Sequence, residues 1–544
     1  MSSKETGGVI EAEPVDFDPE FLDVRDPVVL EKRGTEFDGR DMNRMGKLPQ
    51  LRRTFRFPSI FGYSVVLGAT WEFSLVIVAL SLMNGGTAGG IWIFLAVCVG
   101  MFFVVLSMAE MASRHLHLED SITGSLNLLL QNIKNFSATS SVCIPEYLRL
   151  HAPDLTSLGW FAVIGWQAAM ASIAFACAQQ FEGLIALNLP NYIIKGWHGT
   201  LLSIGVTVFA IIWNTVLVRK LPLLEGIIVI LHVFGFFAFI VVLWVMAPRS
   251  DAKVVWTDFQ DNGNWGNIGL SCLVGMTGPV ITLIGADSAC HLSEELKDAA
   301  WVLPRSMVAT ATVNYIMGFV MTVTVMSTLG DVDNILSTTT GQPYIQVLLN
   351  ATQSQVGTSI MTAVVAVLLL FAAVNLVTTS SRQLFAFARD KGLPFSNSLA
   401  YVRPGWDIPL NAVLTTLAIT TLISLIIIGS SIAFNVIVSI GQVGTVASYI
   451  VAIACIARKR LVKEPLLPSR FNLGKAGLTI NLIALAFLTL AFVFPFFPAQ
   501  SHPNAAEMNW NILVTGFTMG VAMIYYVFRA RFTYRGPVEY VRRL

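Results

Sequence analysis

The chain has 544 residues, of which 54% are hydrophobic and only 13% are charged. Its mean hydropathy of +0.67 excludes an ordinary soluble protein and indicates a multispan membrane protein. The net charge of +1 argues against a nucleic-acid partner, and six cysteines without a CxxC pair indicate neither a disulfide framework nor a metal site.

The first 58 residues are polar, acidic and then basic, and they contain no apolar core of a cleavable signal. They lack hydrophobic periodicity, which is typical of a disordered tail. We therefore expect residues 1–58 to be a disordered cytoplasmic tail and the first span to act as its own insertion signal.

Apolar runs near the roughly 20 residues that a bilayer requires predict twelve membrane spans. The runs lack the short period-two alternation of transmembrane strands, so we expect an all-α integral membrane protein. The expected spans are 59–83, 90–112, 157–187, 197–218, 222–246, 267–291, 307–330, 358–384, 410–428, 432–457, 476–497 and 510–530.

The basic residues predict the orientation of these spans. If both termini are cytoplasmic, only Lys195, Arg249 and Lys253 of the 35 Lys and Arg residues fall in external loops. Such a bias is the positive-inside pattern, so both termini, including a short tail at 531–544, are expected in the cytoplasm. The plasma membrane is the expected location, and the vacuolar membrane is the alternative.

Two spans contain matching interruptions. The first is broken by glycine at 68–70, with Glu72 just beyond, and the sixth is broken at 285–287, where Asp287 lies at membrane depth. A broken helix survives in a bilayer only where it lines a cavity inside the protein, and an ionisable residue there suggests a functional site. The glycines could instead serve close helix packing. Because each break carries an acid, we favour half-helix ends that meet at a shared transport site.

Other polar residues within spans are weaker candidates. Glu182 could line a pathway or simply reach the interface, and His291, one turn past Asp287, is a modest candidate for a proton-linked role. His232, alone among apolar residues, is expected to be hydrogen-bonded structure. Interhelical hydrogen bonds are expected from Asn375, Asn435 and Gln442.

Several motifs resemble the amino acid–polyamine–organocation superfamily, in particular its fungal amino-acid and choline permeases, which include GABA and choline carriers. The resemblance covers about residues 50–535 and rests on ATWE (69–72), SMAEMAS (107–113), GWQAA (165–169), GADSACHLSEEL (285–296) with PR at 304–305, and SSRQLFAFARDKGLPFS (380–396).

The resemblance implies a core of two five-helix inverted repeats at 59–457 and two further helices at 476–530. It also implies a substrate site between the broken spans and alternating access driven by a proton gradient. The substrate-binding residues that we expect are Gly68, Ala69, Thr70, Trp71 and Glu72 with Ile284, Gly285, Ala286 and Asp287, and the candidates for proton coupling are Glu72, Asp287, Glu182 and His291.

Residues 114–156 depart from the family pattern, because they are polar and contain a single glycine, Gly124. One interpretation is an insertion in a tolerant cytoplasmic loop. The other is a translated intron or a shifted exon boundary in the gene, and if the segment is genuine, transport by this chain is in doubt.

The sequence therefore predicts a secondary transporter for a small zwitterionic or cationic amine, such as an amino acid, GABA or choline. A transporter-like nutrient sensor is the alternative, although the short tails leave little room for signalling domains. A multispan enzyme is disfavoured because the seven histidines are scattered. No cofactor or metal site is expected. ATP-driven transport is not expected either, because no GxxxxGK[ST] loop occurs. Oligomeric state is left open.

Overall fold

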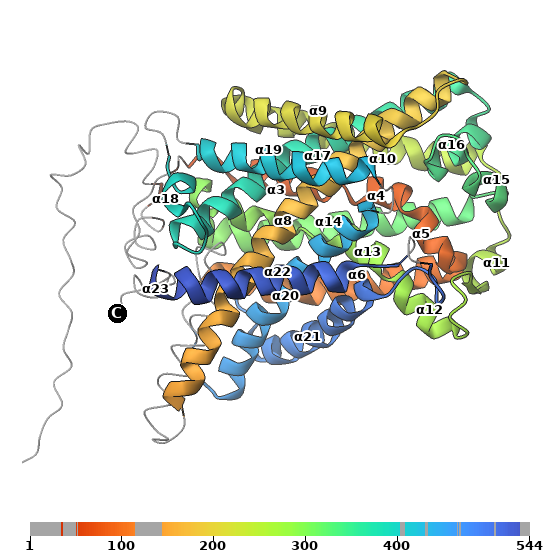
Figure 1. Cartoon of the computed structure of the whole chain (residues 1–544). Helices are drawn as coiled ribbons and strands as arrows, with labels where there is room; N and C mark the ends of the chain where they lie inside the picture. Colours follow the sequence, from red (N-terminus) through yellow and green to blue (C-terminus); the bar gives the residue numbers. More distant parts are fainter. Residues whose placement is uncertain are drawn as a thin grey trace, which may run out of the picture.

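The structure is a computed structural model that describes residues 34, 35, 38, 51, 53–114, 144–402, 408–429, 433–464, 466, 469–504 and 508–533, with the backbone alone at 144–158, 219, 222, 333 and 433–438. Within these residues, twelve helices are long and apolar enough to cross a membrane. They run side by side across Figure 1. The predicted all-α fold with twelve spans is therefore confirmed.

Of the first five spans, only the first is divided into shorter helices. The first span is divided into α3 (Phe57–Gly68), α4 (Thr70–Val76) and α5 (Val78–Met83), and α3 begins with a proline in its first turn. Proline suits that position because it has no N–H to leave unpaired. The next four spans are α6 (Gly86–Arg114), α8 (Ile144–Asn188), α9 (Gly196–Thr215) and α10 (Leu221–Met246).

The sixth span repeats the division of the first. It consists of α12 (Ile268–Gly275), α13 (Thr277–Leu283), a non-helical stretch and the 3-10 helix η3 (Ser288–Glu295). The side chain of Asn267 caps α12 by accepting a hydrogen bond from the N–H of Leu270. Both interruptions that the sequence predicts are confirmed.

The remaining spans are α14 (Ala299–Ser327), α17 (Gln355–Arg389), α19 (Leu410–Leu425) with η4 (Ile426–Ile428), α20 (Ala433–Leu461), α21 (Gly477–Val493) and α22 (Asn511–Tyr525) with a π-turn, η7 (Tyr526–Ala530). Pairs of spans that are five apart in chain order and pack against each other include α6 with α14, α8 with α17, and α9 with α19. This offset of five is what two five-helix repeats predict. Helices α21 and α22 pack outside them, against α6, α8 and α20.

Short elements occupy the two ends of the bundle. At one end, which we call the α16 end, lie α11 (Ala252–Thr257), α15 (Val332–Leu336), α16 (Pro343–Thr352) and a small antiparallel pair, β1 (Asn84–Gly85) with β2 (Gln260–Asp261). At the other, the α18 end, lie α18 (Ser396–Leu399) and α23 (Arg531–Thr533) (Figure 1).

Two predicted segments fall partly outside the described residues. Most of the tail at 1–58 does, although Arg53 and Phe55 near its end are buried against the span six region. The atypical segment 114–156 is described only at Arg114 and from Ile144, where the backbone of α8 already begins. The hypothesis of a gene error there stays a prediction.

Candidate functional site

The first break lies at Ala69, which links α3 to α4. Ala69 adopts a left-handed conformation, with φ 41° and ψ 40°, which is uncommon for a residue with a Cβ. Its N–H reaches the carbonyl of Val65 at a weak 3.4 Å. Asn314 on α14 supplements that bond, because its Nδ2 donates to the same carbonyl at 3.2 Å. The broken backbone is therefore stabilised by a neighbouring helix.

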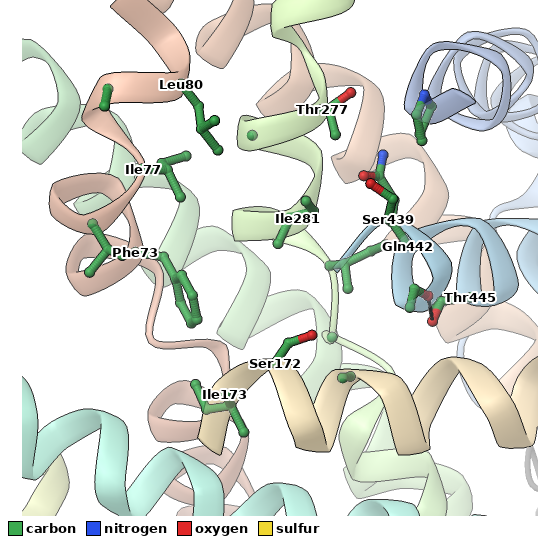
Figure 2. Close-up of a pocket in the computed structure, with 18 of the residues that line it drawn as sticks. Phe73, Ile77, Leu80, Ser172, Ile173, Thr277, Ile281, Ser439, Gln442 and Thr445 are labelled. Carbon is green, nitrogen blue, oxygen red and sulfur yellow. Dashed lines mark hydrogen bonds between the residues drawn. The ribbon is translucent and has the colours of Figure 1, made fainter. Parts of the chain in front are cut away.

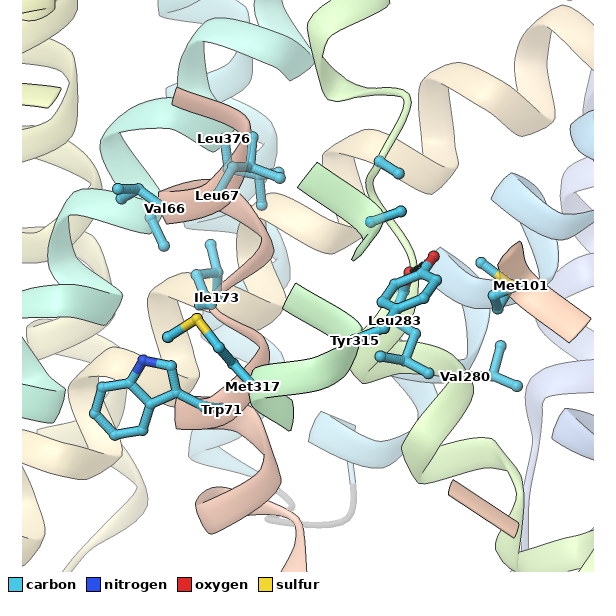
Figure 3. Close-up of a cluster of buried hydrophobic side chains, with 14 of the residues drawn as sticks. Val66, Leu67, Trp71, Met101, Ile173, Val280, Leu283, Tyr315, Met317 and Leu376 are labelled. Atoms are coloured by element: carbon cyan, nitrogen blue, oxygen red, sulfur yellow. Dashed lines mark hydrogen bonds between the residues drawn. The ribbon is translucent and has the colours of Figure 1, made fainter. Parts of the chain in front are cut away.

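The second break is held in the same way. Gly285 has a φ of 108°, which a residue with a side chain rarely adopts. Leu283 is the last residue of α13, and its carbonyl accepts a hydrogen bond from the Tyr315 hydroxyl at 3.0 Å. Figure 3 shows Tyr315 beside Leu283. Neighbouring residues of α14 thus satisfy one carbonyl at each break, as a low-dielectric interior requires.

A cavity of about 400 Å³ lies between the two breaks, and Gly68, Ile284 and Gly285 line it. Figure 2 shows apolar side chains of the first span, such as Phe73 and Ile77, facing Ile281 of α13 across it. Ser172 of α8 and Thr445 of α20 add hydroxyl groups. Among the described residues, none of the lining side chains is ionisable. The cavity is mostly apolar with a few polar groups, as is usual for small-molecule sites.

The cavity extends towards the α16 end of the bundle. Its lining continues to Asn84, to Gln342 just before α16, and to Asn509 just before α22. The β1–β2 pair lies at this rim, where Asp261 accepts hydrogen bonds from the N–H groups of Trp265 and Gly266 at 3.1 and 2.8 Å. These bonds, that of Trp265 first, lower the pKa of the Asp261 carboxyl, so it is charged at neutral pH.

The α18 end is closed by backbone bonds and ion pairs. Phe55 donates to the carbonyl of Glu295 at 3.0 Å, and Arg53 Nη1 donates to the carbonyl of Leu296 at 2.6 Å. The Glu295 carboxylate in turn binds Arg382 of α17 at 2.9 Å. These contacts fasten the start of the first span, the end of the sixth and the end of the eighth together.

Glu294 extends this closure, because it binds Arg389 at 2.6 Å. The paired acids of the GADSACHLSEEL motif and the arginines of the SSRQLFAFAR motif are therefore partners. We call the group Arg53, Phe55, Glu294, Glu295, Leu296, Arg382 and Arg389 the α18-end gate.

Glu72 lies one turn past the first break and contacts a histidine rather than the cavity. Its Oε1 is 2.7 Å from Nδ1 of His232 on α10, and both side chains are buried. Oε2 of Glu72 and Nε2 of His232 have no hydrogen-bond partner among the described residues. The expectation that His232 is hydrogen-bonded is confirmed, and its partner is the predicted site acid.

Asp287, at the second break, is also paired with a histidine. Its Oδ1 accepts a hydrogen bond from the Tyr449 hydroxyl of α20, and its Oδ2 lies 3.8 Å from Nε2 of His291. The rings of His291 and Trp166 meet edge to face, with 4.9 Å between their centroids, and Trp166 lines the cavity. Each break is therefore followed by a buried acid beside a histidine.

The predicted substrate contacts divide into two groups. Gly68, Ile284 and Gly285 line the cavity, whereas Ala69, Thr70, Trp71, Glu72, Ala286 and Asp287 are outside its lining. Trp71 packs instead on Phe239 and His232, with ring centroids 5.1 and 5.8 Å apart, and Figure 3 shows it beside Met317. The turn at Ala69 directs the start of α4 towards α10, where Trp71 and Glu72 find their partners, and the first span returns to the cavity wall at Phe73.

Glu182 lies on α8, away from both breaks. It is buried beside Gly199 of α9, and its Oε1 has no hydrogen-bond partner among the described residues. The structure therefore does not bring Glu182 to the lining of the cavity. Within the described part of the chain, no group of three His, Cys, Asp or Glu side chains could hold a metal ion.

Asn314, Tyr315 and Tyr449 contact the residues at the breaks from other helices, and no sequence motif predicts them. Asn314 and Tyr315 follow one another in an apolar span, and nothing in that pattern points to the breaks. Interhelical bonding by Gln442 and Asn375 was expected and is confirmed, since Gln442 donates to the carbonyl of Ala491 and Asn375 to that of Tyr63. The side chain of Asn435 lies outside the described residues.

The geometry agrees with comparisons to known proteins. The family model described as amino acid permease matches residues 59–518. The chain belongs to this family. The family match covers both breaks, the cavity and the gate residues from Glu294 onwards. Since its members are transporters and not enzymes, the permease assignment also agrees with the expected absence of a catalytic site.

Three fungal relatives illustrate the similarity. The permease is 28% identical to an uncharacterized amino-acid permease of Schizosaccharomyces pombe over 97% of this chain and 95% of that one. It is 25% identical to amino-acid permease 2 of Neurospora crassa, over 94% and 91% of the two chains. A choline transporter of Saccharomyces cerevisiae is 25% identical over 88% and 82%.

Proposed function

We propose that this permease is a secondary active transporter that carries a small amino acid or amine, such as GABA or choline, by alternating access with a coupling proton. The observation that carries the proposal is the cavity between the two breaks, which reaches the α16 end while the α18-end gate is shut. A pathway closed at one end is one of the two states that alternating access needs.

The positive-inside pattern supports placing the α18 end in the cytoplasm. The cavity would then face outwards, ready to receive substrate. Opening the gate requires Glu295 to separate from Arg382 and Phe55 to leave its backbone partners. Because these contacts join the first, sixth and eighth spans, movement of the broken spans against α17 would break them together. The plasma membrane is the proposed location.

The uncharged lining favours a substrate without net charge. A net cation in a low-dielectric site without a counter-charge is costly, whereas a zwitterion can be met by hydrogen-bonding groups. In this proposal Gly68, Gly285 and Ile284 contact the substrate directly. The six other predicted residues lie behind the lining, where they shape the breaks and supply the carboxyl groups of Glu72 and Asp287.

The two acid–histidine pairs support proton coupling. A carboxylate beside a histidine gives a proton two neighbouring binding groups inside the protein, and such intramembrane groups commonly form proton relays. Asp287 with His291 stands closest to the cavity through Trp166, and Glu72 with His232 stands behind the first break. Glu182 is the weaker candidate, because it is remote from both.

Radiolabelled uptake in a permease-deficient yeast, measured for a panel of amino acids, GABA, polyamines and choline at two external pH values, tests the proposal. Concentrative uptake of at least one compound, faster at the lower external pH, is expected. Surface protein that takes up none of them contradicts it. Such a result together with a ligand-dependent growth response would favour the nutrient-sensor alternative. Absence of both uptake and a growth response would favour a transport-defective chain altered at 114–156.

A further inference from the structure

Five amide side chains of the described residues line the cavity, those of Asn84, Gln179, Gln342, Gln442 and Asn509, and three of them accept a hydrogen bond at the amide oxygen within the protein. Asn84 Oδ1 accepts a hydrogen bond from Ser271 at 3.2 Å, Gln342 Oε1 from Gln180 at 3.3 Å, and Asn509 Oδ1 from the N–H of Asn511 at 3.1 Å. Their amide nitrogens also donate to backbone carbonyls. Each of these three amides therefore has a partner within the protein at both its oxygen and its nitrogen.

Gln442 on α20 is different. It lines the cavity with only 2% of its surface exposed, and its Oε1 has no hydrogen-bond partner among the described residues. Its Nε2 donates to the carbonyl of Ala491 on α21 at 3.3 Å. That bond fixes the orientation of the amide, because exchanging nitrogen and oxygen would set two acceptors against each other. The oxygen is therefore the end that is left over.

We propose that Gln442 is a specificity residue, whose Oε1 accepts a hydrogen bond from an N–H group of the substrate. This inference rests on the proposed transport function and adds the substrate class, a primary or secondary amine or amide. A buried acceptor without a partner is costly, and a donor on the ligand removes that cost. Gln442 faces Thr277 and Ile281 of α13 across the cavity (Figure 2), so a ligand between the breaks can reach it.

The position discriminates between two kinds of nitrogen. A primary ammonium group carries N–H donors, whereas a quaternary ammonium has none and would leave Oε1 unpaired. Sites built around such a hydrogen bond reject analogues that lack the donor. Gln442 therefore favours amino acids, GABA or primary amines over choline, although the aromatic residues Phe73, Trp166 and Phe497 also line the cavity.

Paired probes test this inference. GABA is compared with γ-butyrobetaine, its N-trimethyl form, and ethanolamine with choline, both by competition in uptake and by ligand-induced thermal shift of the purified protein. The variants are Gln442→Leu and Gln442→Glu. Gln383→Leu is the matched control, since Gln383 is also buried with an unpartnered Oε1 but does not line the cavity.

Wild type is expected to prefer the primary amine of each pair that it recognises, by about tenfold or more, the ratio that corresponds to one hydrogen bond to a charged group. Gln442→Leu should remove that preference by weakening only the primary amine, while Gln442→Glu, which keeps an acceptor, and Gln383→Leu retain it. The inference is overturned if Gln442→Leu weakens binding of both members of a pair equally, or if wild type prefers the trimethyl form. Either result leaves the proposed transport function standing. If neither uptake nor a thermal shift occurs with any probe, the proposed function itself fails.

Discussion

Asn314 and Tyr315, consecutive residues of α14, each donate a hydrogen bond to a carbonyl at a different broken helix, at 3.2 Å to Val65 and at 3.0 Å to Leu283. One turn of the seventh span therefore supports both halves of the site. Because the two donors share a backbone, a shift of α14 changes the support of both breaks together. Rearrangement of this helix is a physical means of coupling the two broken spans.

The Gly68→Ala variant should lose about as much uptake as the Asn314→Ala variant. The added Cβ would lie 2.4 Å from Nδ2 of Asn314, so the amide must move away from Val65. Loss of that buried hydrogen bond costs about 1–3 kcal/mol. Gly205→Ala is the control, because nothing lies within 4 Å of its Cβ position. Uptake by the double variant Gly68→Ala/Asn314→Ala should be no worse than by Asn314→Ala alone, and additive losses would count against this mechanism.

Breaking the α18-end gate should let the cavity open at that end. Arg382→Gln leaves Glu295 buried without its ion partner, and loss of one partner of a buried pair costs roughly 3–5 kcal/mol. Arg470→Gln is the control, because Arg470 and Asp298 form an exposed pair, which is worth about 1 kcal/mol or less. We expect concentrative uptake to be lost in Arg382→Gln, with faster efflux from preloaded cells. Unchanged efflux would show that the pair does not hold the gate.

The Glu72–His232 pair should act as a unit. His232→Asn leaves Glu72 without the contact at 2.7 Å, so its effect on uptake and on the pH profile should match that of Glu72→Gln. The double variant should resemble either single one, because both remove the same interaction. The test is to measure uptake by the two single variants and the double variant at external pH values from 4 to 8. Different pH profiles for the two single variants would mean that the residues work separately.

Asp287→Asn should abolish concentrative uptake with the protein still at the surface. The amide keeps the shape but cannot bind a proton as the carboxylate does, and it alters the bond from Tyr449. Asp258→Asn, in the loop between α11 and β2, should transport normally. Surface labelling with parallel uptake distinguishes loss of function from loss of protein, and normal accumulation in Asp287→Asn would remove this residue from the mechanism.

The sequence predicts the spans and the places of both breaks, because span length and buried glycines are local signals. The small elements at the α16 end are not predicted, since α11, α15 and the β1–β2 pair are too short to show a period. Partners such as Tyr449 for Asp287 depend on how distant spans pack, and one sequence carries no trace of that pairing.

The direction of the Trp71 side chain could not be predicted from the neighbouring sequence. The sequence places Trp71 beside the break and therefore beside a substrate. Its actual direction depends on the left-handed turn at Ala69, which rotates α4 so that Trp71 packs on Phe239. Alanine gives no sign of that conformation, because such turns usually fall at glycine or asparagine.

The proposed transport requires a ligand cavity between the two broken spans that is reached from the α16 end. The most direct measurement is the reaction of Ile281→Cys, in the cavity wall, with a membrane-impermeant thiol reagent added outside intact cells, with and without transported substrate. We expect the reagent to block uptake and the substrate to protect the cysteine from the reagent. A cysteine that stays unreactive, or that reacts equally fast with saturating substrate, would contradict this expectation.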